Sequence, residues 1–231
     1  MVLHEEEAGS RAPEGGDLGR MYRRRFSDPE ARAQMWQVLY EDFFSRFVPA
    51  DADFLEIGAG YCEFTNVVRA RRKIAVDLNA DCRQHAAGDV EVICTPSDDL
   101  GTVASASVDV VFASNFFEHI TREQIVGTLR EVRRVLRPTG RLLILQPNIR
   151  FCARDYWMFF DHITPLDDRS LTEALETNGF AVREVIVRFL PYTTQGRLPA
   201  SARLLRVYLR VPLLWRVFGQ QSFIDAVPSP R

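Results

Sequence analysis

The chain has 231 residues, of which 46% are hydrophobic and 26% are charged, and its formal net charge is −2. This length and composition are typical of one soluble domain with a sizeable core, or at most of two small ones, and we expect one. The nearly neutral charge argues against a general nucleic-acid-binding protein, whose binding face carries an excess of Lys and Arg.

The four cysteines lie far apart, without a Cys-x-x-Cys pair or a His/Cys cluster at the spacing of metal ligands; they are Cys62, Cys82, Cys94 and Cys152. We therefore predict reduced thiols and no metal. The N-terminus lacks the basic start and apolar core of a signal peptide, and no apolar run approaches the roughly 18 residues of a membrane span. These patterns predict a cytoplasmic protein.

Residues 1–20 contain almost no large apolar side chain, which predicts a disordered tail, and we expect residues 21–231 to form a single domain. An N-terminal helical segment is predicted within 21–49, where Ser27 or Asp28 can cap a helix and Pro29 suits its first turn. Its apolar residues recur at spacings of three and four. This helix either packs on the domain or forms a lid over a ligand.

A glycine loop follows the apolar residues Phe54, Leu55 and Ile57, which predict the end of a buried parallel strand. Gly58 and Gly60 indicate a tight turn, and the run from Tyr61 to Arg72 is predicted to be a helix. Without Cβ atoms, the glycines let a ligand approach the helix start, where unpaired N–H groups point outward.

The residues around this loop disfavour a dinucleotide. A dinucleotide loop has glycine at the sixth place of G-x-G-x-x-G, where this chain has Glu63, and Glu56 stands two residues before Gly58. Two carboxylates would repel a pyrophosphate, whereas Glu56 favours a cationic ligand group. An NAD-type oxidoreductase is therefore the weaker alternative.

Strands and helices alternate along the rest of the chain. Strands are predicted at 73–79, 90–94, 108–115, 141–146, 181–190 and 222–227, and helices at 121–136 and 168–175. This alternation predicts an α/β fold with a doubly wound, mostly parallel sheet. Asp77, near the end of the second strand, is expected beside the glycine loop, where its carboxylate can accept both ribose hydroxyl protons.

The glycine loop, Asp77 and the block from Asn115 to His119 together resemble the S-adenosylmethionine-dependent methyltransferases with the Rossmann-like fold. The first motif of that family runs acid-x-Gly-x-Gly-x-Gly, and Glu56, Gly58 and Gly60 match it, while Cys62 replaces the third glycine. The resemblance spans residues 50–227. It implies a seven-stranded sheet with an antiparallel last strand and S-adenosylmethionine as the cofactor.

The resemblance also implies where the cofactor is bound. Ser97 and Asp98 fall in the loop that borders the adenine, and Asn115 and Phe116 fall at the mouth of the site beside the methionine. The full set of expected cofactor contacts is Glu56, Gly58, Ala59, Gly60, Asp77, Leu78, Ser97, Asp98, Asn115 and Phe116.

The acceptor side is expected in the last third of the chain. Residues 155–162 are predicted to form an aromatic loop above the ligand edge of the sheet, since loops beyond the carboxyl ends of parallel strands hold ligands. The predicted substrate-binding residues are Asn148, Tyr156, Trp157 and Tyr192. An insertion at about 191–221 follows.

Two histidines are candidate catalytic bases. His162 is the first, because the adjacent Asp161 could fix its tautomer and raise its pKa, and His119 is the second. The alternative for each is a hydrogen bond that orders a loop.

The stretch from Val185 to Ile224 contains no acid but has six arginines, which are Arg188, Arg197, Arg203, Arg206, Arg210 and Arg216. Interleaved with leucines and Trp215, they could hold an anionic substrate group or contact an anionic membrane surface. The alternative is a solvated face.

These patterns predict an enzyme that transfers a methyl group from S-adenosylmethionine to a small molecule. The last third is similar to methyltransferases of bacterial glycan, lipid and secondary-metabolite pathways, which makes a sugar, a lipid-linked glycan or a secondary metabolite with an anionic group the expected acceptor. The alternative from another class is a non-catalytic scaffold that binds adenosylmethionine, for which Cys62 is the hint. A nucleic-acid substrate is disfavoured because no basic-aromatic reader motif is present.

Overall fold

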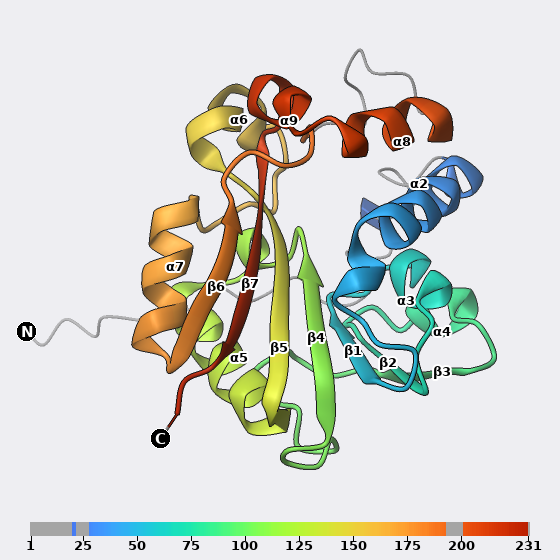
Figure 1. Cartoon of the computed structure of the whole chain (residues 1–231). Coiled ribbons are helices and arrows are strands. Elements are labelled where there is room, and N and C mark those ends of the chain that lie inside the picture. Colours follow the sequence, from blue (N-terminus) through green and yellow to red (C-terminus); the bar gives the residue numbers. More distant parts are fainter. Residues whose placement is uncertain (1–19, 22–27, 193–200, 231) are drawn as a thin grey trace, which may run out of the picture.

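The computed structural model describes residues 20–21, 28–192 and 201–230, and these form one seven-stranded sheet with helices on both faces (Figure 1). The order across the sheet is β3-β2-β1-β4-β5-β7-β6. The strands are β1 (Asp53–Ile57), β2 (Arg72–Val76), β3 (Val90–Ile93), β4 (Val108–Ser114), β5 (Leu136–Pro147), β6 (Phe180–Ile186) and β7 (Gln221–Pro228). Strand β7 is antiparallel to both of its neighbours, and the pairs among β1 to β5 are parallel. The predicted fold is confirmed.

The central strands are buried on both faces, which is why their sequences are nearly continuous apolar runs. Successive side chains of β1 point to opposite faces, so that Leu55 and Phe54 belong to two different cores. The Leu55 core is covered by α5 (Arg122–Val135) and α7 (Asp168–Thr177). The Phe54 core is covered by α2 (Pro29–Asp42), the 3₁₀ turn η1 (Phe44–Arg46), α3 (Glu63–Val67) and α8 (Ala202–Arg210).

Helix α2 packs on the sheet through an aromatic cluster. The Trp36 ring of α2 lies 5.1 Å from that of Phe64 in α3, and Phe44 of η1, which is fully buried, lies 5.3 Å from Phe64 and 5.2 Å from Phe112 in β4. The Arg32 guanidinium lies 2.7 Å from the Glu63 carboxylate and ties α2 to the start of α3. Asp28 caps α2 by accepting the Ala31 N–H at 3.0 Å, which is one of the two predicted caps. The other, Ser27, lies outside the described residues.

Several boundaries differ from the predictions. The helix expected from Tyr61 to Arg72 is only α3, because Cys62 adopts a left-handed conformation before it and Val68 an extended one after it. The strand expected to reach Leu190 ends at Ile186. Residues 1–19 of the predicted tail and Arg197 fall outside the described residues, while Arg20 is described and helical.

The expected aromatic loop is partly helical. Asn148 accepts the Arg150 N–H at 3.1 Å and caps α6 (Ile149–Tyr156), whose last turn leads into the aromatic residues. Two more helices, α8 and α9 (Pro212–Phe218), lie between β6 and β7; α4 (Cys82–His85) and the 3₁₀ turn η2 (Phe117–His119) complete the described elements. Among the residues that the structure describes, no helix is long and apolar enough to cross a membrane.

Candidate active site

The glycine loop joins the ends of two parallel strands. Gly58 and Gly60 have positive φ angles of 66° and 56°, and the N–H groups of Gly58 and Ala59 both donate to the Val76 carbonyl at the end of β2. A Cβ atom added at Gly58 would lie 2.5 Å from Phe116 Cδ2. Only glycine fits there, because it combines the left-handed backbone with the close approach of Phe116. The loop thereby brings the ends of β1, β2 and β4 together.

Cys62 occupies the place of the third motif glycine and has a φ of 58°. Glycine adopts this conformation freely, whereas a residue with a Cβ atom is strained there by roughly 1 kcal/mol. Its buried Sγ lies 3.0 Å from the Sγ of Cys82, a contact that the sequence did not predict. The hydrogen bond with Cys62 and burial both raise the pKa of the Cys82 thiol, which therefore stays protonated.

Glu56 is buried under the loop. Its carboxylate accepts hydrogen bonds from the Thr65 N–H at 3.0 Å and from the Thr65 hydroxyl. Burial raises the pKa of Glu56 to about 8, and the two hydrogen bonds from Thr65 oppose this effect. A cationic group near Glu56 would favour its ionised form, so the carboxylate is suited to a positively charged ligand.

Asp77 connects the end of β2 to the loop. Its carboxylate accepts the Gly60 N–H at 2.7 Å and the Asn79 N–H at 2.7 Å, one on each oxygen. A carboxylate has about four acceptor sites, so lone pairs remain for ribose hydroxyls. The neighbouring Leu78 is 47% exposed and offers an apolar surface beside them.

Two buried polar atoms at this edge lack a partner within the described part of the chain. They are the Asn79 amide nitrogen, after β2, and the Asn115 amide oxygen, after β4. Asn115 has a φ of 47°, and its amide nitrogen donates to Ser114 Oγ. Because buried polar groups are almost always hydrogen-bonded, an unpaired donor and an unpaired acceptor around one loop indicate a polar ligand. A nucleoside with an amino-acid chain offers partners to both, so the residues fit S-adenosylmethionine.

The expected adenine loop is packed against α5. Ser97 is buried with its hydroxyl 2.6 Å from that of Thr128, and Asp98 is exposed with its Cβ beside Gly127. The hydrogen bond between Ser97 and Thr128 favours a packing role for Ser97. The contacts of Ser97 and Asp98 with adenine stay predictions.

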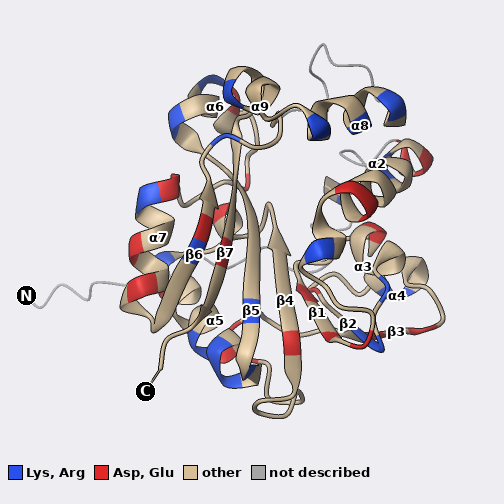
Figure 2. Cartoon of the chain, in the orientation of Figure 1, with Lys and Arg blue, Asp and Glu red and all other residues tan. Residues whose placement is uncertain are grey.

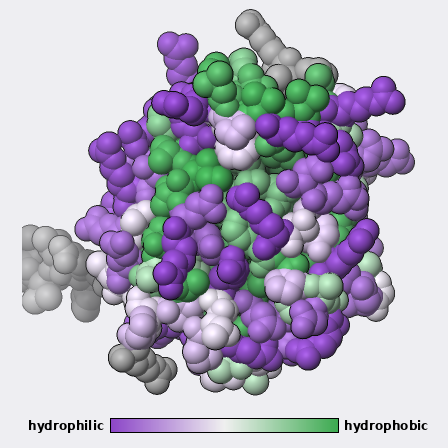
Figure 3. All heavy atoms as spheres, viewed as in Figure 1, coloured by the Kyte–Doolittle hydropathy of each residue, from purple (hydrophilic) through white to green (hydrophobic). Residues whose placement is uncertain are grey.

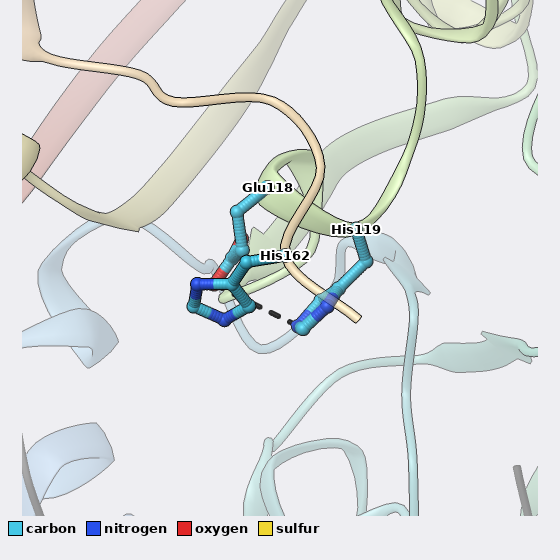
Figure 4. A group of neighbouring side chains, drawn as sticks. All are labelled: Glu118, His119 and His162. Atoms are coloured by element: carbon cyan, nitrogen blue, oxygen red, sulfur yellow. Dashed lines mark ion pairs between the residues drawn. The ribbon is translucent and has the colours of Figure 1, made fainter. Parts of the chain in front are cut away.

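Two histidines far apart in the sequence meet beyond the end of β4 (Figure 4). The rings of His119 and His162 lie 4.8 Å apart, and Glu118 lies beside them. Asp161, which the sequence placed next to His162, lies against His119, with its Oδ2 3.1 Å from His119 Nδ1. His162 Nε2 lies 3.4 Å from the Tyr192 hydroxyl.

The charges around His119 favour its protonated form. Burial lowers the pKa of His119, but the carboxylates of Glu118 and Asp161 outweigh it and raise the pKa above its ordinary value. Burial raises the pKa of Glu118, whose Oε2 accepts the Gln146 amide at 2.9 Å and whose Oε1 lies 3.8 Å from His119 Nε2. Glu118 was not among the predicted site residues, because His162 lies far from it in the sequence and only the fold brings the two together.

The same cluster could also hold a cation, although the sequence predicted no metal. Glu118, His119 and His162 each offer one ligand atom, and these atoms lie within 4.8 Å of one another. Two imidazoles and one carboxylate suit a divalent transition metal.

Two of the four predicted substrate residues, Asn148 and Tyr156, are buried and donate hydrogen bonds within the protein. The Asn148 amide, which is buried, donates to Asp168 at 2.6 Å and to Ser222 at 2.9 Å. Tyr156 is fully buried and donates its hydroxyl to the Thr164 carbonyl at 2.5 Å. Trp157 is 55% exposed, and Tyr192 lies against His162. The structure therefore brings Tyr192 to the histidines and favours a packing role for Asn148 and Tyr156.

The arginines of the last third fall into two groups. Arg188 donates to the carbonyls of Gly219 and Val217, and Arg206 pairs with Glu41 at 2.6 Å. Arg203, Arg210 and Arg216 are exposed. The first two residues hold elements together, and among the described arginines of the stretch from Val185 to Ile224 only the second group is open to a ligand.

Comparisons with known proteins agree with this geometry. Residues 55–144, which include the glycine loop, Asp77 and η2, match the sequence family described as methyltransferase domain. Over these residues the chain is similar to class I methyltransferases. The cofactor of this domain family is S-adenosylmethionine.

One relative with a related sequence is a probable S-adenosylmethionine-dependent methyltransferase of Mycolicibacterium smegmatis, 32% identical over 157 residues. The match covers 65% of this chain and 59% of the relative, so the methyltransferase domain described here spans about three fifths of that protein.

Two solved structures share the fold. A methyltransferase from Archaeoglobus fulgidus has a TM-score of 0.65 at 21% identity and covers 90% of this chain and 99% of its own. A putative methyltransferase in complex with the Haloferax volcanii Trm112 activator has a TM-score of 0.68 at 17% identity and covers 95% and 99%. At these sequence identities, the two matches show that the fold is shared and nothing about the substrate.

Proposed function

We propose that this chain catalyses methyl transfer from S-adenosylmethionine to a small-molecule acceptor. The observation that carries the proposal is the position of the His119–Asp161 pair at the end of η2, on the same edge of the sheet as Glu56, Asp77 and the unpaired Asn115 amide oxygen. A cofactor cradle and a candidate base thus share one edge of the sheet.

The residues of the loops would hold the cofactor in distinct ways. Asp77 accepts the ribose hydroxyls, Asn115 accepts an N–H of the methionine part, and Glu56 favours its positive charge. When bound, S-adenosylmethionine supplies an electrophilic methyl group. The chain's task is to place the acceptor atom in line with that methyl group and to exclude water, since positioning supplies much of the rate.

His119 is the better placed candidate base. With its Nδ1–H donated to Asp161, its Nε2 is left to accept a proton from the acceptor. The raised pKa strengthens this base, and Glu118 stabilises the imidazolium that forms. His162 and the Tyr192 hydroxyl would orient the acceptor from the other side.

The acceptor class follows from the groups around this edge. Exposed Arg203, Arg210 and Arg216 support an anionic group, and exposed Trp157 supports an apolar part. A phosphorylated or lipid-linked sugar has both, and such an acceptor would place the protein in bacterial biosynthesis at the cytoplasmic side of a membrane.

A labelled-methyl screen against nucleotide sugars, lipid-linked glycans, prenyl phosphates and phenols tests the proposal. We expect label transfer to an acceptor with an anionic group, a large loss of turnover in His119→Ala, and no loss in His85→Ala, a histidine of α4. Binding of adenosylmethionine without label transfer to any acceptor would favour the scaffold alternative.

A further inference from the structure

An apolar surface lies at the end of the molecule formed by α6, α8 and α9. On α9, Leu213, Val217 and Phe218 are 66%, 57% and 47% exposed. After α6, Trp157, Met158 and Phe160 are 55%, 53% and 98% exposed, and on α8 Leu204 and Val207 are about half exposed. These eight residues are called the apolar cap here. Large exposed apolar patches of this kind mark interaction sites.

The three parts of the cap are joined by direct contacts. The Gln220 amide, just after α9, donates to the Phe151 carbonyl of α6 at 3.0 Å, and the Gln220 side-chain oxygen accepts the Tyr192 N–H. The Phe159 ring lies 5.8 Å from that of Tyr192, and Trp215 of α9 donates to the Tyr208 carbonyl of α8 at 2.8 Å. Figure 3 shows hydrophobic side chains gathered at this end of the molecule.

The charge of this surface has one dominant sign. Helices α8 and α9 contain no acid, and Figure 2 shows their basic residues in blue beside those of α6. Arg203, Arg210 and Arg216 are exposed among the apolar residues, as is Arg154 on α6. This contrasts with the whole chain, whose net charge is −2. A surface that is both apolar and positive complements a layer whose interior is apolar and whose surface is negative.

The cap also lies at the ligand edge of the sheet. Helix α6 starts directly after β5, at the carboxyl end of a parallel strand, and Figure 1 shows α8 and α9 at the same end of the molecule. A partner that covered the cap would therefore lie next to the loops of the candidate active site.

We propose that the apolar cap docks on an anionic lipid bilayer. Leu213, Phe218, Trp157 and Phe160 enter the boundary between headgroups and acyl chains, and Arg154, Arg203, Arg210 and Arg216 face the lipid phosphates. The excess of arginines over acids at this face favours a bilayer over a second copy of this chain, since two copies joined here would bring like charges together.

Co-sedimentation with vesicles tests the docking without reference to methyl transfer. The full chain is mixed with vesicles of phosphatidylcholine alone or with about a third of phosphatidylglycerol. We expect binding to the anionic vesicles that is at least roughly tenfold tighter than to neutral ones and that weakens as salt rises. A variant without methyltransferase activity, such as Glu56→Gln, should bind the vesicles as the wild type does, so this test is separate from that of the proposed function.

Matched variants assign the binding to the cap. The triple variant Arg210→Gln, Arg216→Gln and Leu213→Ser should lose vesicle binding by more than roughly tenfold. The control is Arg122→Gln, Arg130→Gln and Val126→Ser, which makes the same changes at exposed positions of α5 and should bind as the wild type does. Equal binding by both triple variants, binding to neither vesicle, or a dimer in light scattering that the cap variant alone abolishes would overturn the proposal.

Discussion

At the scale of single residues, the site combines strained backbone with buried charge. Cys62 and Asn115 have left-handed conformations on either side of the glycine loop, and Glu56 and Asp77 are buried carboxylates that hold the backbone around it. Burying a carboxylate raises its pKa unless a cation or enough hydrogen bonds compensate, and burial outweighs the hydrogen bonds at both acids. The loop is therefore arranged for a ligand that carries positive charge.

Glu56 should make the stability of the ligand-free protein depend on pH. Its pKa rises from 4.5 to about 8 on folding, so its contribution is fully present below pH 4.5 and is lost as the pH rises to about 8. Relative to Glu56→Gln, the wild type should lose roughly 1 kcal/mol of unfolding free energy for each pH unit in this window. Urea unfolding at several pH values measures it, with the exposed Glu123→Gln as control; parallel curves for wild type and Glu56→Gln would contradict the burial of an ionisable group.

Asp161 should set the pH at which His119 acts. Burial lowers the pKa of His119, but the carboxylates of Glu118 and Asp161 raise it overall, so removing the Asp161 charge lowers it. In Asp161→Asn the acid limb of the pH–rate profile should move to lower pH, and turnover on the plateau should fall, because the imidazolium that forms loses the Asp161 charge while the backbone carbonyl of residue 161, 3.2 Å from Nδ1, still fixes the tautomer. Asp155→Asn, a nearby acid, should leave the limb in place. If the acid limb did not move in Asp161→Asn, His119 would not be the base and its role would be structural.

Treatment with a chelator distinguishes a catalytic base from a metal site at Glu118, His119 and His162. If His119 acts as a base, dialysis against a chelator should leave the rate unchanged, since no cation takes part. Loss of activity in the chelator and recovery on adding one divalent metal would make Glu118, His119 and His162 ligands instead, and would correct the absence of metal predicted from the sequence.

At the scale of elements, helix ends and strand ends decide where the site lies. Thr121 caps α5 with a reciprocal capping box, in which its hydroxyl accepts the Gln124 N–H and the Gln124 side chain accepts the Thr121 N–H. This cap begins α5 directly after His119 and so fixes the exit of the chain from the histidine cluster.

Removal of this cap should cost a predictable amount. In Thr121→Ala the Gln124 N–H loses its acceptor at the first turn of α5, and the unfolding free energy should fall by about 1 kcal/mol. Chemical denaturation measures the change, with Thr177→Ala near the end of α7 as control. A loss no greater than that of the control would show that the box contributes nothing to stability.

The elements also show what sequence could and could not predict. Strands β1 and β4 were predictable because each is a continuous apolar run, and α5 was predictable from Thr121 and Gln124. Helix α3 was predicted too long because its end is set by the extended backbone of Val68, which has no marker residue. Helix α6 was missed because its capping residue, Asn148, was interpreted as a ligand contact in a loop.

At the scale of the whole molecule, sequence predicted the proximity of the candidate cofactor residues better than that of the candidate acceptor residues. The cofactor residues follow successive strand ends, so their neighbourhood follows from the fold alone. Other contacts depend instead on how segments that are distant in the sequence pack against each other. Examples are the contacts between His119 and Asp161 and between Cys62 and Cys82. In the proposed function the acceptor side depends on such contacts and on the arginine-rich helices α8 and α9, whose positions do not follow from the order of the strands.

The central claim is that this fold binds S-adenosylmethionine through Asp77 and the glycine loop. Titration calorimetry with adenosylhomocysteine and with NAD tests it most directly, on the wild type and on Asp77→Ala. We predict that adenosylhomocysteine binds more tightly than NAD, and that Asp77→Ala weakens it by about 1 to 3 kcal/mol because the ribose hydroxyls lose their acceptor. Tighter binding of NAD, or an unchanged affinity in Asp77→Ala, would contradict the account.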